Sequence, residues 1–386
     1  MVRATTRAVH WAVVRGALGL ALGAGIAGCS PNQKNAESAN VEASKGTDGG
    51  SNSGVSIRLE TADWTRVKTR FSILSTIAGK GSLDNGNDWA PSFEGGSATA
   101  AELSRPHMAL TDASGNLYIA DKESHAIRKV TPDGTIHTVA GTNASGNAPD
   151  AATPALEGAL SSPNGLWVNP DGTFYIVDLG NAKVRRVTPQ GQMSTLFAMA
   201  SLSVGRGLWV AEDESEALVA SGSELLAWTP SGGVRTLASG FGGLGMVLKT
   251  KTGRILAGDR EGLRVYEVTP DGKRTVIAGN GTSDTFVDGG RATETAFNEP
   301  RAIWPYGEGL LVGLHDGCRI IYIDNEGYSH LMLRGSKKSH AGDGEPYDAT
   351  RATIGEVRSI TVDASGNLIF VENDTGVVRR LTAASP

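Results

Sequence analysis

The chain has 386 residues, 51 of them glycine, and a formal net charge of −5. The glycine content is well above the usual level of about 7%, but glycine does not recur at every third position, which excludes a collagen-like fibre. The acidic charge balance argues against a nucleic-acid binder. Two cysteines exclude a small domain held together by disulfides. A chain of this length holds one large β domain or two ordinary domains.

The first 28 residues have the features of an export signal. Arg3, Arg7 and Arg15 form a positive region, and residues 17–26 form an apolar stretch that is shorter than the about 20 residues of a membrane span. The Ile-Ala-Gly-Cys sequence that ends at Cys29 resembles the bacterial lipobox. The resemblance implies cleavage before Cys29 and acylation of its thiol, whereas an ordinary secreted protein is the alternative.

Three consequences for organisation and localisation follow. Residues 1–28 are expected to be a lipoprotein signal peptide. Residues 29–56 are rich in Ser, Asn and Gly without apolar periodicity, so we expect a flexible tether. The protein is then expected to be attached by its lipid anchor in the bacterial cell envelope, at the outer membrane, with its folded domain facing away from the bilayer.

The rest of the chain is one repeat that occurs six times. Its frame starts with Pro-x, passes through short strands separated by turns such as Asp133-Gly134, and ends with a Val-Thr-Pro segment and a last strand. The position after Pro-x marks each unit, at Met108, Gly165, Gly207, Gly245, Ala302 and Ser359. Each unit holds four short β-runs. Four strands repeated six times predict an all-β fold, a six-bladed β-propeller.

The two ends of the repeat region complement each other. The sixth unit supplies three strands and then the chain ends, while residues 73–79 match the last strand of other units, residues 136–141 and 274–279. We therefore expect the N-terminal strand to complete the last blade and to close the ring. Residues 57–386 are expected to form this single propeller domain.

The repeat frame resembles the NHL repeat family, most clearly in residues 112–121 with the sequence DASGNLYIAD. The first two units match closely, the sixth matches in part, and the third and fourth are degenerate. The resemblance implies an NHL-like six-bladed propeller. It says little about function, because such propellers include enzymes, sensors and adhesion modules.

Propeller topology indicates which face to search for a site. The first strand of each blade lies innermost, so the connections from an outer strand to the next inner strand share a face with the loops between strands two and three. Four of these connections are long, at residues 79–105, 141–162, 279–299 and 334–356. We expect them to form a collar around one mouth of the central channel.

The residue before each marker position begins the inner strand at that mouth. These residues form a predicted mouth ring of His107, Asn164, Arg206, Leu244, Arg301 and Arg358. Three arginines with a histidine and an asparagine would attract an anion, since the forked guanidinium suits carboxylate or phosphate. The alternative is that these side chains pair with neighbouring Asp and Glu.

Metal chemistry is not expected at this ring. Residues 164–167 (NGLW) are similar to the metal-binding segment of gluconolactonase-type propellers, which also need carboxylates for a divalent cation, and the ring positions have none. Zinc-dependent lyases with related repeats use several histidines, and only His107 occupies the matching place. We therefore expect no metal and no cofactor.

Other polar and aromatic residues have structural interpretations. Asp121, Asp178, Asp259 and Asp316 recur at the end of second strands, where each is expected to accept loop N–H groups or an arginine. Three tryptophans early in inner strands, Trp167, Trp209 and Trp304, are expected between blades. His125, His315 and His340 are expected on the collar face as solvated side chains, although His107 with His315-Asp316 is the best match to streptogramin-type lyases.

We predict a non-catalytic, monomeric binding scaffold, anchored to the membrane by lipid, whose collar face binds a protein, a peptide or a glycan. The alternative is a lyase or hydrolase at the channel mouth, in which His107 and a ring arginine stabilise an anionic intermediate.

Overall fold

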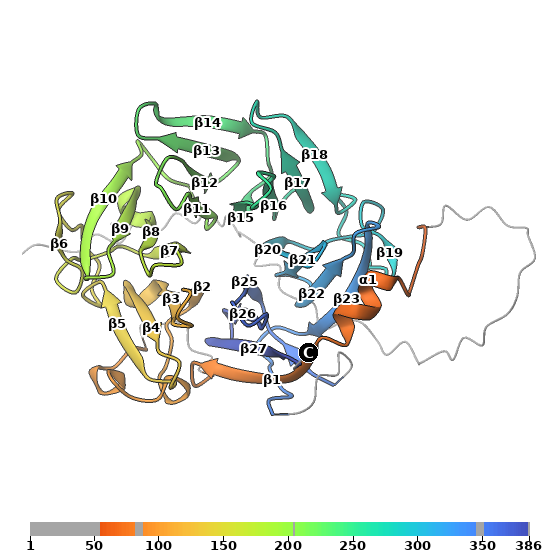
Figure 1. Cartoon of the computed structure of the whole chain (residues 1–386), viewed down its shortest axis with the longest axis horizontal. Helices are drawn as coiled ribbons and strands as arrows, with labels where there is room; N and C mark the ends of the chain where they lie inside the picture. The colour runs from red at the N-terminus through yellow and green to blue at the C-terminus, as the bar shows by residue number, and fades with distance from the viewer. Residues whose placement is uncertain (1–54, 82–87, 204, 345–350, 385–386) are drawn as a thin grey trace, which may run out of the picture.

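The computed structural model describes residues 55–81, 88–203, 205–344 and 351–384. The expected signal peptide, Cys29 and most of the expected tether lie outside these described residues. The described chain forms six antiparallel sheets arranged as blades around a central axis (Figure 1). This confirms the prediction of an all-β six-bladed propeller. Within the described ranges no helix is long and apolar enough to cross a bilayer.

Each blade has four strands, which are numbered here from the centre outwards. Blade one contains β2 (Pro106–Thr111), β3 (Leu117–Asp121), β4 (Ala126–Val130) and β5 (Ile136–Ala140); blade two contains β7 (Pro163–Val168), β8 (Phe174–Asp178), β9 (Lys183–Val187) and β10 (Gln192–Ala198). Blade three contains β11 (Leu208–Val210), β12 (Ala217–Ser221), β13 (Glu224–Thr229) and β14 (Gly233–Ser239); blade four contains β15 (Leu244–Lys249), β16 (Ile255–Asp259), β17 (Arg264–Val268) and β18 (Arg274–Ala278). Blade five contains β20 (Pro300–Tyr306), β21 (Gly309–Leu314), β22 (Arg319–Ile323) and β23 (Tyr328–Gly335); blade six contains β25 (Val357–Val362), β26 (Leu368–Glu372), β27 (Val377–Ala383) and β1 (Phe71–Ala78).

The N-terminal strand closes the ring as predicted. β1 pairs antiparallel with β27, so that Leu74 lies opposite Leu381. Both side chains are buried in a cluster that continues through Phe370 of β26 into blade five. The closing strand therefore contributes to the apolar core as well as to the sheet edge.

The second strand of each blade lies between neighbours on both sides, and its side chains are buried throughout. In β3, β8 and β26 every residue is buried, whereas the outer strands alternate more, as in β14. Apolar runs of five residues with β-branched or aromatic side chains suit this doubly covered position.

Three equivalent glycines allow the outer strand to leave the sheet. At Gly79, Gly141 and Gly279 the backbone has a positive φ of 81 to 91°. A Cβ at Gly141 would lie 2.3 Å from the carbonyl oxygen of His125, and the other two sites show the same clash with backbone. Only glycine combines this conformation with so close an approach.

Buried ion pairs fix the mouth ends of three blades. Asp121 accepts hydrogen bonds from the Ser104 N–H at 2.6 Å and from the Nε of Arg128 at 3.0 Å. Arg185 binds Asp178 in the same way in blade two, and Arg379 binds Glu372 in blade six. The three arginines are fully buried. The structural role predicted for Asp121 and Asp178 is confirmed.

The prediction for the other two aspartates is right in one case and wrong in the other. Asp259 accepts the backbone N–H groups of Gly242 and Gly243, as expected for a loop-fixing carboxylate. Asp316 lies two residues beyond the end of β21, and the equivalent strand-end position holds Leu314. The sequence alignment failed there because the loop of blade five carries its aspartate later.

Three of the long connections each contact the outer edge of the blade that they enter. β6 (Thr153–Pro154) pairs with β10 and β19 (Gly290–Arg291) pairs with β23, and Ser97 forms a bridge to Thr135 beside β5 (Figure 1). These segments cover the unpaired N–H and C=O groups of the outer strands. In three of the four connections, part of the segment predicted to form the collar therefore lies at the outer edge of a blade.

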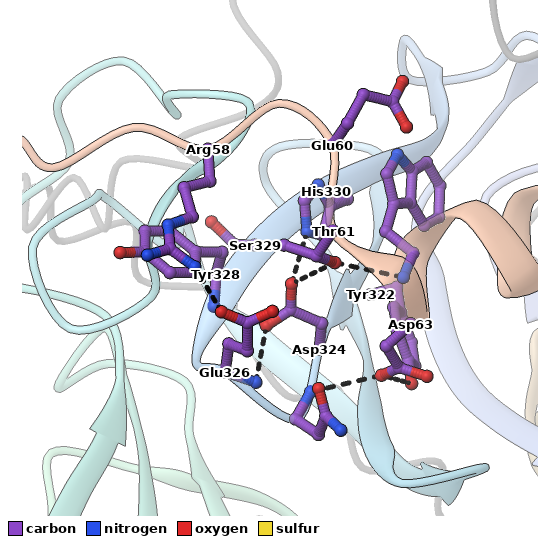
Figure 2. Close-up of polar contacts among 12 residues, drawn as sticks. Arg58, Glu60, Thr61, Asp63, Tyr322, Asp324, Glu326, Tyr328, Ser329 and His330 are labelled. Atoms are coloured by element: carbon purple, nitrogen blue, oxygen red, sulfur yellow. Dashed lines mark hydrogen bonds and ion pairs between the residues drawn. The ribbon is translucent and has the colours of Figure 1, made fainter.

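A short helix precedes the first strand and docks on blade five (Figures 1 and 2). Helix α1 (Ala62–Lys68) starts with the hydroxyl of Thr61 accepting the N–H of Trp64, and the same hydroxyl donates to Asp324 at 2.7 Å. Trp64 stacks on His330 with ring centroids 4.9 Å apart, and His330 also contacts Asp324 at 2.9 Å. The helix is therefore held by a buried polar network together with an aromatic stack.

Candidate functional site

Backbone irregularities at the start of the inner strands position the mouth ring. In β2, Pro106 pairs with Asp121 and Met108 pairs with Ala120, so His107 is an extra, bulged residue. The same two-against-one register places Asn164, Arg301 and Arg358 at bulges in blades two, five and six. A β-bulge redirects a side chain that a regular strand would turn into a neighbouring sheet. The repeated bulge thus gives four blades a polar residue at the same height.

Blade four departs from the predicted ring. Leu244 pairs with Asp259, as Pro106 does with Asp121, so the ring position of this blade is Gly245. Leu244 is buried in an apolar cluster with Phe241. The prediction placed Leu244 in the ring because blade four lacks the proline that marks the frame elsewhere. Arg206 in blade three precedes β11 and occupies the ring position. The N–H of Ala220 donates to the carbonyl oxygen of Gly207, which corresponds to the pairing of Met108 with Ala120 in blade one.

The ring side chains are buried and lie close enough to influence one another. The pKa of Arg206 is held well below its ordinary value, first by burial and then by the charges of Arg358 and Arg301. Burial, followed by the charge of Arg358, lowers the pKa of Arg301 to about 9. A guanidinium stays protonated in proteins, so these shifts reflect the burial of several positive charges beside one another.

Arg206 is the least compensated member of the ring. Its side chain is 5% exposed, and it makes no hydrogen bond or ion pair to any described residue. By contrast, Arg301 donates to Glu299 at 2.9 Å and Arg358 donates to Glu356 at 3.0 Å. The alternative that ring arginines pair with neighbouring carboxylates therefore holds for two of the three.

His107 and Asn164 are fixed by backbone carbonyl groups. The His107 Nδ1 lies 2.8 Å from the carbonyl oxygen of Arg105, and Asn164 donates to the carbonyl oxygen of Gly205 at 2.6 Å. Burial, reinforced by Arg206 and Arg358, holds the pKa of His107 well below its ordinary value. The imidazole is therefore neutral at pH 7, with Nδ1 as the donor.

A second cluster of polar side chains adjoins the ring, and the sequence does not predict that its members lie together. Its central residue is His315, whose Nε2 lies 2.6 Å from Glu356 and whose Nδ1 lies 2.7 Å from Glu299. The nearby Lys337 contacts the other oxygen of Glu356 at 2.9 Å. His315 is buried, so the expectation of a solvated side chain is wrong for it.

The sequence does contain a signal for this group. A glutamate lies two residues before the ring arginine in blades five and six, as Glu299-x-Arg301 and Glu356-x-Arg358. Glu299 has a left-handed backbone with φ of 54°, and so does Arg105 before His107, with φ of 55°. Ser162 at the equivalent place in blade two has φ of 50°, so this conformation belongs to the repeated start of the inner strand.

The other predicted histidines are separate from this group. His125 accepts a hydrogen bond from the backbone N–H of Ser162 at 3.0 Å, and so helps to join blades one and two. The ring of His340 lies against Gly81. Within the described ranges, no group of three or more His, Cys, Asp or Glu side chains could hold a metal ion.

Tryptophans fill the channel beneath the ring. Trp167, Trp209 and Trp304 each lie three residues after a ring residue, and the Trp167 ring centroid is 6.3 Å from that of Trp209 and 6.1 Å from that of Trp304. Trp167 and Trp304 belong to blades two and five, which face each other across the channel (Figure 1). The prediction that they pack between blades is incomplete, because they also span the channel. The polar ring residues and these tryptophans thus lie at different heights along the inner strands.

Comparisons with known proteins agree with this fold. Residues 97–188 match the family described as the teneurin NHL domain. Teneurin-3 of zebrafish (Danio rerio) is 38% identical over 104 residues, which cover 23% of this chain and 4% of that protein. Teneurin-3 of mouse (Mus musculus) is 38% identical over 87 residues, 19% of this chain and 3% of that protein. The chain thus matches only a small part of these relatives.

Solved structures resemble the whole propeller. A protein of unknown function from Bacteroides thetaiotaomicron has a TM-score of 0.65 at 15% identity, over 81% of this chain and 76% of that one. An auxiliary nutrient binding protein from Bacteroides ovatus has a TM-score of 0.60 at 13% identity, over 82% and 78% of the two chains. A gluconolactonase from Xanthomonas campestris has a TM-score of 0.55 at 13% identity, over 85% and 95%. At these identities the likeness concerns the fold alone.

Proposed function

We propose that this NHL-repeat six-bladed β-propeller is a monomeric, non-catalytic binding protein, anchored by lipid at Cys29 to the bacterial outer membrane, which binds an anionic group of a protein, a peptide or a glycan at the channel mouth. The proposal keeps the binding role expected from the sequence. It places the binding site at the mouth ring instead of on the collar loops, because segments of two long connections lie at outer blade edges.

The observation that carries the proposal is the buried guanidinium of Arg206, which lacks an anionic partner among the described residues. The ring has three arginines and only two neighbouring carboxylates, Glu299 and Glu356. These two carboxylates form ion pairs with Arg301 and Arg358. Leaving a buried charge unpaired costs several kcal/mol. A ligand carboxylate or phosphate would supply the missing charge with bidentate geometry.

Two comparisons bear on the proposal. The Bacteroides ovatus protein with the same architecture is named as a nutrient binding protein, which supports a binding role. The Xanthomonas campestris propeller is named as a gluconolactonase. Here the two glutamates nearest the mouth are engaged by arginine and histidine, so they are poorly placed to serve as ligands of a divalent cation.

The test is an equilibrium titration of the purified protein with D-glucuronate, a carboxylate that glycans carry. Isothermal titration calorimetry at pH 7 should show saturable binding, and Arg206→Gln should weaken it by tenfold or more, as loss of a buried charge contact does. Arg235→Gln, on the exposed outer strand β14, is the matched control and should leave binding unchanged. Absence of binding by glucuronate, citrate and phosphate alike, or an equal loss in both variants, would overturn the proposal.

One observation favours an enzyme as the second candidate. His107 is a neutral imidazole beside the charges of Arg206 and Arg358, an arrangement that could remove a proton next to a bound carboxylate. Catalysis predicts that His107→Ala abolishes turnover while the melting temperature is kept. Binding predicts graded affinity losses over several mouth residues. Incubation of the protein with D-glucono-δ-lactone tests for the reaction named for the structurally similar gluconolactonase. Hydrolysis of the lactone is measured by the proton that it releases, and this measurement distinguishes the two candidate functions.

A further inference from the structure

The polar group beside the ring shares its oxygens with the ring itself. A single oxygen of Glu299, Oε2, contacts both Arg301 at 2.9 Å and His315 at 2.7 Å. A single oxygen of Glu356, also Oε2, contacts both Arg358 at 3.0 Å and His315 at 2.6 Å. His315 is therefore linked to two ring arginines through one carboxylate oxygen on each side.

The proton count on His315 changes what the carboxylates do. Both ring nitrogens face a carboxylate oxygen, and only the doubly protonated imidazolium donates to both. With one proton, the ring donates to one glutamate and presents a lone pair to the other. The second glutamate then keeps more of its negative charge facing Arg301 or Arg358, and so repels an incoming anion.

The groups that face His315 come from every element packed against it. Glu299 and Arg301 lie at the start of β20, Glu356 and Arg358 lie at the start of β25, Asp316 follows in the same loop, and Lys337 comes from the segment after β23. Although burial alone raises the pKa of Glu299, the hydrogen bond from His315 and the charge of Arg301 lower it to about 2.

The pKa values of the other groups around His315, and of His315 itself, are shifted for different reasons. The pKa of Glu356 is likewise held far below its usual range, because the effect of burial is outweighed by His315, Arg358 and Lys337. Burial raises the pKa of Asp316, but that carboxyl still lies beside the cationic Lys337. Burial holds the pKa of His315 below its ordinary value, although its hydrogen bonds with Glu299 and Glu356 act in the opposite direction.

We propose that the mouth takes up its anion together with a proton on His315, so that carboxylate binding tightens as pH falls. The inference rests on the anion site of the proposed function. With His315 neutral, the three ring arginines and two glutamates carry one net positive charge, and with His315 protonated they carry two. Because linkage is reciprocal, an anion that binds near the ring favours protonation of His315 as much as protonation favours the anion.

The experiment measures the dissociation constant of D-glucuronate from pH 5.5 to 8, a range in which this carboxylate stays ionised. The wild-type affinity should rise as pH falls, by at most about tenfold per pH unit for one linked proton. His315→Gln, which cannot gain the proton, should bind with an affinity that is nearly constant over the range. His137→Gln, on the exposed face of outer strand β5, is the matched control and should retain the wild-type slope.

A second measurement detects the proton directly. Calorimetric titrations at one pH, in two buffers with different ionisation enthalpies, report the number of protons taken up for each anion bound. That number should be positive for the wild type and close to zero for His315→Gln. Unchanged proton uptake in this variant, or pH-independent binding by the wild type, would overturn the inference while leaving the anion site intact. Absence of binding by glucuronate, citrate and phosphate alike, at every pH, would instead overturn the proposed function.

Discussion

The ion pair between Arg128 and Asp121 provides a strict test of how the blades are held together. Both side chains are fully buried, and Arg128 also donates to Thr138 at 2.5 Å and lies 3.6 Å from the ring centroid of Trp89. Arg128→Leu leaves the carboxylate of Asp121 buried without its cation. Breaking a buried pair in this way costs about 3–5 kcal/mol, so we expect the free energy of unfolding to fall by that amount.

Blade three shows how to rescue the variant. At the positions of Asp121 and Arg128 it carries Ser221 and Leu226, and the hydroxyl of Ser221 still accepts a loop N–H, from Ser203 at 3.2 Å. The double variant Asp121→Ser with Arg128→Leu copies this pair. It removes the isolated charge and loses mainly the contact with the Trp89 ring, so its net cost should be about 1–2 kcal/mol.

The assay is urea unfolding followed by tryptophan fluorescence, with the midpoint and slope compared among the variants. Lys129→Leu, the next residue along β4 and only partly buried, is the control and should change stability by no more than about 0.5 kcal/mol. If the double variant is as unstable as Arg128→Leu alone, then lost packing rather than an uncompensated carboxylate explains the cost, and the reasoning from charge fails.

Three further predictions concern other parts of the molecule. The folded protein holds the pKa of His107 well below 6.5, so just below pH 6.5 only the unfolded chain gains this proton. The free energy of unfolding should then decline by up to about 1.4 kcal/mol per pH unit because of this residue. Urea unfolding at pH 7 and at pH 5 should show a smaller decline for His107→Gln than for the wild type. Gly141→Ala should lower the free energy of unfolding more than Gly134→Ala does in the same assay. Both residues have positive φ, but only at Gly141 would the new Cβ meet backbone, 2.3 Å from the carbonyl oxygen of His125. Trp64→Ala removes a buried side chain of the cluster that joins α1, β1 and blade five, so it should undock α1, detected as faster tryptic cleavage at Arg66, and lower the urea midpoint.

The overall architecture could be predicted because the sequence pattern of one blade occurs six times along the chain. Each blade repeats the same turn and strand signals, so errors at single positions, such as Leu244, leave the fold unaffected. The closing strand was recognised for the same reason, since residues 73–79 resemble the last strands of complete blades. The degenerate third and fourth units nevertheless form complete four-stranded blades.

The site was predicted in part, because its members come from two kinds of segment. Ring residues lie at a fixed place in the repeat, so an alignment of units finds them. Glu299, His315 and Glu356 come from a connection, a loop and another connection, and only the folded ring brings them together. Helix α1 is not predicted from the sequence, because it has only seven residues and is buried against residues that lie about 260 positions later in the chain.

The two chain segments that meet in blade six lie close enough to be joined, which would allow the order of the blades along the chain to be changed. The N–H of Ala384 donates to the carbonyl oxygen of Arg70 at 2.6 Å, and Phe71 lies opposite Ala383 in the sheet. A short peptide could therefore join residue 384 to residue 70, and new termini could be opened in an exposed turn such as the one at Gly253. Such a circular permutant would have β27 and β1 as a covalent hairpin, in the way that every other blade already connects its two outer strands.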